Sequence, residues 1–244
     1  MSLLPESLNM LTYLKIIREK LLKEGKLIKY MTYAAGEILI VVIGIIVALY
    51  LNNRNQERIN NKLEIQYYQT IKNQLNEDLN TLVDVMDYDQ RHLNQFFYAK
   101  KSILLNNENK LDTLGKIAMS MVRYGDFRRK SNSYQTLVNS GEIKIIKSKK
   151  IREKLESLEQ YYMYINRLEE NHETIVYSQI IPVLTQVIRF DPLKVEDPGA
   201  FFDYKFLNNF DKLIILMVEK MEVYKQAKDE ILSTIELIDQ ELKK

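Results

Sequence analysis

The feature that most constrains this chain is an apolar run from Met31 to Leu51, in which Glu37 is the only charged residue. At ~1.5 Å of rise per residue, a helix over this run is about 32 Å long, close to the hydrocarbon thickness of a bilayer. A helix buried in a soluble core is usually shorter and apolar on one face only. A cleaved signal peptide would need small residues near Ala48–Leu51, where large ones stand. The run therefore predicts an uncleaved transmembrane helix over residues 31–51.

Flanking charge predicts the orientation of this helix. Six Lys or Arg residues precede it in the arm 1–30, whereas three follow it, at Arg54, Arg58 and Lys62. Because positive charge near a span favours the cytoplasmic side, the N-terminus is expected inside. Residues 52–244 are then extracytoplasmic, which in a bacterium means periplasmic, with the anchor in the inner membrane. The arm fits either a basic amphipathic helix in the headgroup layer or a plain extension of the membrane helix.

Three short strings around the span carry a resemblance. They are KYMTYAAGEI from Lys29 to Ile38, VVIGI from Val41 to Ile45 and NNRN from Asn52 to Asn55. In these strings the chain resembles an uncharacterised family of bacterial single-pass membrane proteins with a K-Y-x-x-Y-A-x-G-E-[IL] start. A weaker similarity lies in YQTLVNSG from Tyr134 to Gly141. The resemblance implies a membrane anchor with an extracytoplasmic helical domain, and it brings no known activity.

The composition of residues 52–244 limits both fold and function. These residues hold 29 Lys or Arg and 29 Asp or Glu, so the domain is neutral, whereas nucleic-acid-binding domains carry a basic excess. The chain has no cysteine, which excludes disulfides, zinc–thiolate sites and cysteine nucleophiles. Seven glycines and four prolines among 244 residues leave few turns, which favours long helices.

Apolar residues at three- and four-residue spacing predict three long helices in this domain. They are expected from the 60s to about Asn106, from about 151 to 189 with a bend at Pro182, and from about 210 to 242. The last one has apolar residues every seven positions, as in coiled coils. Its two stripes are Phe210, Met217, Tyr224, Ile231 and Ile238, and Ile214, Met221, Ile235 and Leu242, with Lys228 as a break.

Two short helices are expected between the long ones, at 111–123 and 133–139. Ser131 or Asn132 would cap the second, and Gly141 would end it. Residues 189–205 are expected to form a loop. The predicted fold class is all-α: a single N-terminal transmembrane helix followed by an antiparallel up-and-down helical bundle with coiled-coil-like packing.

Few residues of the domain point to chemistry. His172 lies on the apolar face of its helix, three residues after Glu169, and with no further ligands at metal-binding spacing it is expected to be a hydrogen-bonded core or boundary histidine. Asp87 and Asp89 interrupt the apolar pattern of the first long helix, which predicts a kink or a solvated patch. No serine-hydrolase, dinucleotide-binding or phosphate-loop motif is present. No catalytic, metal-binding or cofactor-binding residue is therefore assigned, and no cofactor is expected.

Two surfaces are candidates for binding, although packing or solubility explains each of them as well. The first joins a tyrosine-rich region to the 189–205 loop and would contact a ligand or partner through Tyr161, Tyr162, Tyr164, Arg189, Phe201 and Phe202. The second is basic and would meet an anionic polymer, lipid headgroups or an acidic partner. Its residues are Arg128, Arg129, Lys130, Lys144, Lys147, Lys149, Lys150 and Arg152.

Small residues on one side of the predicted membrane helix indicate self-association. Gly44 and Ala48 have the four-residue spacing that lets two helix backbones approach closely in lipid. Gly36 and Ile40 extend this stripe, and Glu37 lies at its edge. A carboxylate in hydrocarbon is costly, so Glu37 is either functional or reaches the headgroups.

The leading hypothesis for function is a membrane-anchored, non-enzymatic interaction or scaffolding subunit of a bacterial envelope assembly. It rests on the missing catalytic motifs and on an arm too short to hold an output domain. The expected partners are membrane lipid and either a second copy of the chain or an envelope protein, and no nucleic acid. The alternatives are a sensor-like small-molecule binder and an envelope hydrolase, which would depend on Asp87, Asp89 or His172.

Overall fold

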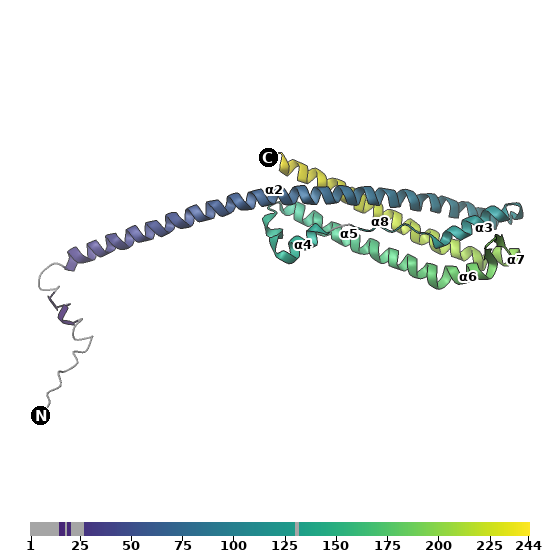
Figure 1. Cartoon of the computed structure of the whole chain (residues 1–244), viewed down its shortest axis with the longest axis horizontal. Coiled ribbons are helices and arrows are strands. Elements are labelled where there is room, and N and C mark those ends of the chain that lie inside the picture. The colour runs from purple at the N-terminus through teal and green to yellow at the C-terminus, as the bar shows by residue number, and fades with distance from the viewer. Residues whose placement is uncertain (1–14, 18, 21–26, 130–131) are drawn as a thin grey trace, which may run out of the picture. The chain divides into compact units, whose positions relative to one another are not determined.

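A computed structural model of the chain describes residues 15–17, 19, 20, 27–129 and 132–244. The chain divides into two compact units, residues 1–61 and 62–244. Helix α2 (Leu27–Leu104) contributes residues to both units (Figure 1). Most of the predicted basic arm lies outside the described residues, so its amphipathic character stays a prediction.

In the first unit, α2 is apolar and exposed. Every described side chain from Ile28 to Ile59 is exposed. By length and composition this helix is apolar enough to cross a membrane, with a mean hydropathy of 2.6 over its most apolar window, none of which is buried. The predicted long apolar helix near the N-terminus is confirmed.

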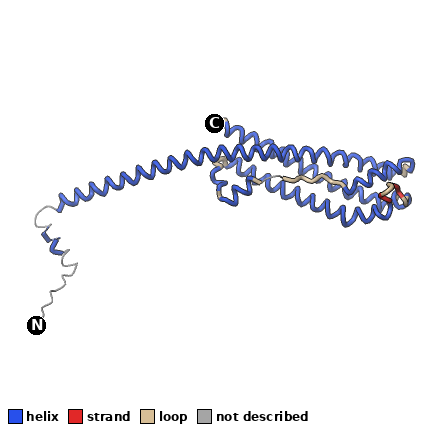
Figure 2. Tube along the Cα trace, viewed as in Figure 1, coloured by secondary structure: helices blue, strands red, loops and turns tan. Residues whose placement is uncertain are grey.

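The second unit consists of packed helices with one small sheet (Figure 2), which confirms the predicted fold class. After α2 its elements are η1 (Glu108–Lys110), α3 (Leu111–Met119), η2 (Ser120–Val122), α4 (Ser133–Ser140), η3 (Glu142–Ile145), α5 (Lys149–Ile175), η4 (Val176–Ile180), α6 (Ile181–Val187), β1 (Ile188–Phe190), β2 (Leu193–Val195), α7 (Pro198–Phe201) and α8 (Tyr204–Leu242).

The long helices of the second unit lie side by side, with α2 and α5 running in one direction and α8 in the opposite one. Ion pairs from Lys72 to Asp239 and from Lys100 to Asp211 run along α2 and α8, so these two helices are antiparallel. Helix α5 also packs along α8. Between α2 and α5 the chain returns along the bundle through α3, an extended segment and α4 (Figure 2). The bundle is therefore up-and-down, but the first stretch that runs back along it is made of these short elements and not of a long helix.

The buried face of α8 differs in part from the predicted heptad. The stripe from Phe210 to Ile238 is buried throughout, as predicted. Met221 of the second predicted stripe is only partly buried. The neighbouring row is wholly buried instead, with 0% exposure at Leu213, Lys220, Ala227 and Thr234. Because α8 contacts α2 and α5 at the same time, its buried face is wider than one coiled-coil seam.

The short helix α4 is correctly predicted down to its ends. The Asn132 side chain accepts a hydrogen bond from the Gln135 N–H at 2.9 Å and caps the helix. Gly141 follows with φ of 76°, the left-handed conformation that ends many helices. At Pro182 the predicted bend takes the form of the five-residue π-helix η4, which precedes α6.

The predicted loop at 189–205 is instead a hairpin followed by a short helix. β1 pairs with β2 in antiparallel register, with Ile188 opposite Val195. Both of these side chains are buried in the core, which ties the hairpin to the bundle. The Asp197 side chain caps α7 by accepting from the Ala200 N–H at 2.9 Å.

Candidate functional site

The centre of the site is the extended segment 123–129, which lies between η2 and α4. Gly125 and Phe127 are buried, whereas Tyr124 and Asp126 are half-buried and Arg128 is exposed, the alternation expected of an extended chain. An extended segment inside a helical bundle has no neighbouring strand to satisfy its backbone groups. Side chains of α2, α5 and α8 supply the partners instead.

Lys220 of α8 and Asp89 of α2 form an ion pair in the core. The Lys220 Nζ lies 3.0 Å from Asp89 Oδ2, and both side chains are 0% exposed. The same ammonium donates to the Gly125 carbonyl at 3.0 Å, and the Gly125 N–H donates to Asp89 Oδ1 at 3.0 Å. The prediction of a kink or solvated patch at Asp89 is wrong, because its carboxylate is buried against a lysine and α2 remains helical there. Asp87 is exposed.

Gly125 permits the close approach of the segment to α2. A Cβ at this position would lie 2.8 Å from both Asp89 Oδ1 and Val85 Cγ1. Real side chains do not tolerate such distances, so a larger residue would push the segment away from the ion pair. The glycine is therefore part of the site.

Glu169 of α5 holds the next inward-facing residue of the segment. Its Oε1 accepts hydrogen bonds from the Phe127 N–H at 2.8 Å and from the Tyr224 hydroxyl at 2.6 Å. Burial raises the pKa of Glu169 to about 7, although these bonds and the Lys220 charge lower it. A hydrogen bond with the Asp126 side chain raises this pKa further. Glu169 therefore exchanges its proton near neutral pH.

His172 lies one turn after Glu169 in α5 and is 0% exposed. Its ring packs on Tyr124, with centroids 4.9 Å apart. Among the described residues neither ring nitrogen has a hydrogen-bond partner, so the core position is as predicted but the hydrogen bond is not. Burial, followed by the Lys220 charge, lowers the pKa of His172 to about 3. The imidazole is therefore neutral at physiological pH.

A surface pocket opens beside Glu169. Its volume is about 200 Å³, and its walls carry several carboxylates and one aromatic ring. The lining residues are Tyr124, Asp126, Arg128, Asn166, Glu169, Glu170 and Glu173. Within the described parts of the chain, no three His, Asp or Glu side chains are placed to hold a metal ion.

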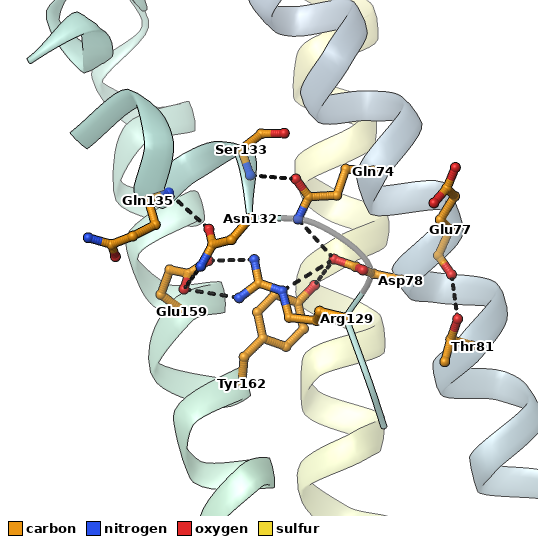
Figure 3. Close-up of polar contacts among 10 residues, drawn as sticks. All are labelled: Gln74, Glu77, Asp78, Thr81, Arg129, Asn132, Ser133, Gln135, Glu159 and Tyr162. Atoms are coloured by element: carbon orange, nitrogen blue, oxygen red, sulfur yellow. Dashed lines mark hydrogen bonds and ion pairs between the residues drawn. The ribbon is translucent and has the colours of Figure 1, made fainter. Parts of the chain in front are cut away.

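A second polar cluster fastens the C-terminal end of the segment (Figure 3). Arg129 donates two hydrogen bonds to Glu159, at 2.8 and 3.0 Å, and its guanidinium lies 4.2 Å from the centre of the Tyr162 ring. The Tyr162 hydroxyl donates to Asp78 Oδ2 at 3.1 Å. Burial raises the pKa of Asp78, and the Arg129 charge opposes this shift. The cluster joins α2, α5 and the segment.

The same cluster extends to the start of α4. Gln74 of α2 accepts a hydrogen bond from the Ser133 N–H at 2.8 Å, and the Asn132 amide donates to Glu159 at 3.3 Å (Figure 3). The side chains of both polar clusters therefore hold in place the part of the chain that connects α3 to α5.

The structure separates the residues of the predicted tyrosine-rich surface into two hydrophobic clusters. Tyr161, Tyr162 and Tyr164 belong to one of them, with Tyr162 buried under Arg129. Phe201 and Phe202 belong to the other: Phe201 is fully buried and Phe202 packs on it. Arg189 is exposed and pairs instead with Glu196. A shared binding role for these residues stays a prediction.

The predicted self-association stripe lies in the exposed part of α2. Gly36, Glu37, Ile40, Gly44 and Ala48 are all exposed. A Cβ at Gly36 or Gly44 would meet nothing within 4 Å. This stripe is available to a second helix, and self-association stays a prediction.

Sequence reasoning missed Lys220 and Gly125. Lys220 stands in a seven-residue row with Leu213, Ala227 and Thr234, so a lysine among small and apolar residues was the available signal. The signal for Gly125 was weaker: the chain has only seven glycines, so each one is a candidate for a position that needs a small residue.

No curated protein and no solved structure matches the chain. A family match covers residues 37–181, which include Asp89, Gly125, Glu169 and His172 but not Lys220. Since this match spans more than half of the chain, the protein belongs to a family of unknown function, DUF6090.

Proposed function

We propose that the protein is a membrane-anchored, non-enzymatic interaction module of a bacterial envelope assembly. In this proposal α2 crosses the inner membrane, the arm 1–30 is cytoplasmic and residues 52–244 are periplasmic. The observation that carries the proposal is the exposed apolar stretch of α2, which is continuous with the first long helix of the bundle. Such an anchor holds the bundle at the membrane surface and leaves the outer faces of the bundle to partners.

The buried charges support an interaction role over a catalytic one. Lys220, Asp89 and Glu169 all bond to backbone groups of the 123–129 segment. Groups that act on a substrate usually face a cleft, whereas Lys220 and Asp89 have no exposed surface. Their contacts explain how the 123–129 segment is held in place, and a catalytic role is not needed to explain why these charged groups are buried.

The alternative of a small-molecule sensor has less support. Its predicted residues lie in different hydrophobic clusters, with Tyr162 in one and Phe201 in the other. A ligand that needed both would have to separate them from the cores in which they are buried. The proposed partners are therefore a second copy of the chain or another envelope protein.

Single cysteines test the proposed topology. The chain has no cysteine of its own, so Ser2→Cys and Lys244→Cys each give one reactive thiol. We expect a membrane-impermeant maleimide to label only the Lys244→Cys protein in intact spheroplasts, and both proteins after lysis. Labelling of both positions in intact spheroplasts would place the two termini on one side and contradict the topology.

Native co-purification tests the interaction role. We expect full-length tagged protein, extracted in a mild detergent, to bring down an envelope protein or a second, differently tagged copy in stoichiometric amount. A variant that lacks residues 62–244 keeps the apolar stretch and serves as the control. Elution of the full-length protein as a lone monomer would rule out a stable assembly.

A further inference from the structure

One end of the bundle carries a concentration of positive charge around the start of α5. The exposed lysines there are Lys144, Lys147, Lys149 and Lys150. Glu64 pairs with Lys147 at 3.6 Å, and Glu153 pairs with Lys149 at 3.3 Å. Within the described ranges Lys144 and Lys150 take part in no ion pair. We call these four lysines the basic end.

The backbone under the basic end is fixed. The Lys147 N–H donates to Glu64 Oε1 of α2 at 2.7 Å. Ile146 is fully buried, and the Arg152 guanidinium donates to the carbonyls of Ile146 and Lys147. The Ser148 side chain caps α5 by accepting from the Ile151 N–H at 3.4 Å. The backbone positions that carry Lys147, Lys149 and Lys150 are therefore fixed close together, while their ammonium groups stay flexible.

The position of this surface along the chain points to the membrane. Glu64 follows Leu51, the last apolar residue of the run, by 13 residues in the same helix, which is about 20 Å of helix. Between them Arg54, Arg58 and Lys62 recur every four residues on one helix face, and all three are exposed. Headgroups extend ~5–8 Å beyond the hydrocarbon, charges act over a Debye length of about 8 Å, and the four-carbon stem of a lysine adds ~6 Å of reach, so together they span the length of this helix segment.

We propose that the basic end binds anionic phospholipid headgroups of the membrane that holds α2. Lysine suits this partner because its ammonium is a flexible, hydrated point charge that can follow mobile phosphates. Cores of protein interfaces are depleted in lysine, and the guanidinium of Arg152, at the start of α5, is occupied by backbone carbonyls. The inference rests on the proposed anchor and does not depend on its orientation.

Energy transfer in nanodiscs tests this contact with the full-length protein. The donor dye is attached through Asn139→Cys, an exposed residue of α4 next to the basic end, and the acceptor is attached to lipid headgroups. One set of nanodiscs contains phosphatidylcholine alone, and the other contains equal parts of phosphatidylcholine and phosphatidylglycerol. We expect higher transfer in the second set, with a return to the level of the first set in high salt.

Charge-neutralising variants locate the effect. Each lysine near an anionic surface favours contact about fivefold, so neutralising three of them should lower the ratio of docked to undocked bundles by about 100-fold. The variant is Lys144→Gln with Lys149→Gln and Lys150→Gln. The matched control removes the same charge at the other end of the bundle (Figure 1), with Lys101→Gln, Lys116→Gln and Lys205→Gln, and should behave like the unchanged protein.

The outcomes separate this inference from the anchor. Equal energy transfer in the two lipid compositions would overturn the inference. An acidic protein would then be the better candidate for the partner of the basic end. An equal loss in the control variant would also overturn it, because net charge rather than the basic end would then be responsible. Failure of the full-length protein to enter nanodiscs would overturn the anchor itself, and the headgroup contact with it.

Discussion

Lys220→Met is expected to lower the free energy of unfolding of the bundle by about 3–5 kcal/mol, the usual cost of removing one partner of a buried ion pair. Methionine replaces most of the lysine stem, so the loss is mainly electrostatic. The Asp89 carboxylate stays wholly buried and loses its partner at 3.0 Å, and the Gly125 carbonyl loses a donor. Chemical denaturation of the full-length protein in detergent measures the change.

A second substitution separates charge from packing. Asp89→Asn in the Lys220→Met background removes the unpaired charge, and the Asn side-chain oxygen can still accept from the Gly125 N–H. We expect the double variant to recover a large part of the lost stability, a coupling that a double-mutant cycle measures. Lys225→Met on the exposed face of α8 is the matched control and should stay within about 0.5 kcal/mol of the unchanged protein. Equal stability of Lys220→Met and Lys225→Met would contradict the buried pair.

The helices were predictable because their signals are local. Hydrophobic spacing identifies α2, α5 and α8, and Asn132 with Gly141 marks both ends of α4. The hairpin after α6 was not predictable in this way. Its strands have three residues each, too few for a periodic pattern, and their pairing is set by the burial of Ile188 and Val195.

The candidate site was only partly predictable, because its parts come from distant segments. Glu169 and His172 were identified as neighbours on one helix, but their environment depends on the 123–129 segment and on α8. In the sequence Arg123 was placed at the end of the predicted helix 111–123, and Arg128 and Arg129 were assigned to the predicted basic surface. Only the fold shows that Gly125 and Phe127 face inward. It also shows that the paired Asp89 and Lys220 bond to the N–H and to the carbonyl of Gly125.

Glu169→Gln is expected to stabilise the bundle at pH 8 and to have little effect at pH 5. Folding raises the pKa of Glu169 from an ordinary 4.5 to about 7, so the folded state binds this proton more tightly than the unfolded state. The stability that this group contributes is therefore full below pH 4.5 and is lost as the pH rises to 7. Glutamine resembles the protonated acid, since its oxygen can accept from Phe127 and Tyr224 while its amide donates toward Asp126.

The expected gain at pH 8 is about 2–3 kcal/mol, or roughly 4–12 °C in melting temperature for a domain of this size. His172 acts in the opposite direction, because its pKa is lowered from 6.5 to about 3 and its contribution is lost as the pH falls. This histidine is present in both proteins, so its effect cancels in the difference between their melting temperatures at each pH. Glu170→Gln removes the same charge from the next, exposed residue and should show no such pH dependence. A difference between Glu169→Gln and the unchanged protein that stays constant from pH 5 to pH 8 would mean that Glu169 is ionised in the folded bundle throughout this range, with the Lys220 charge and its two hydrogen bonds outweighing its burial.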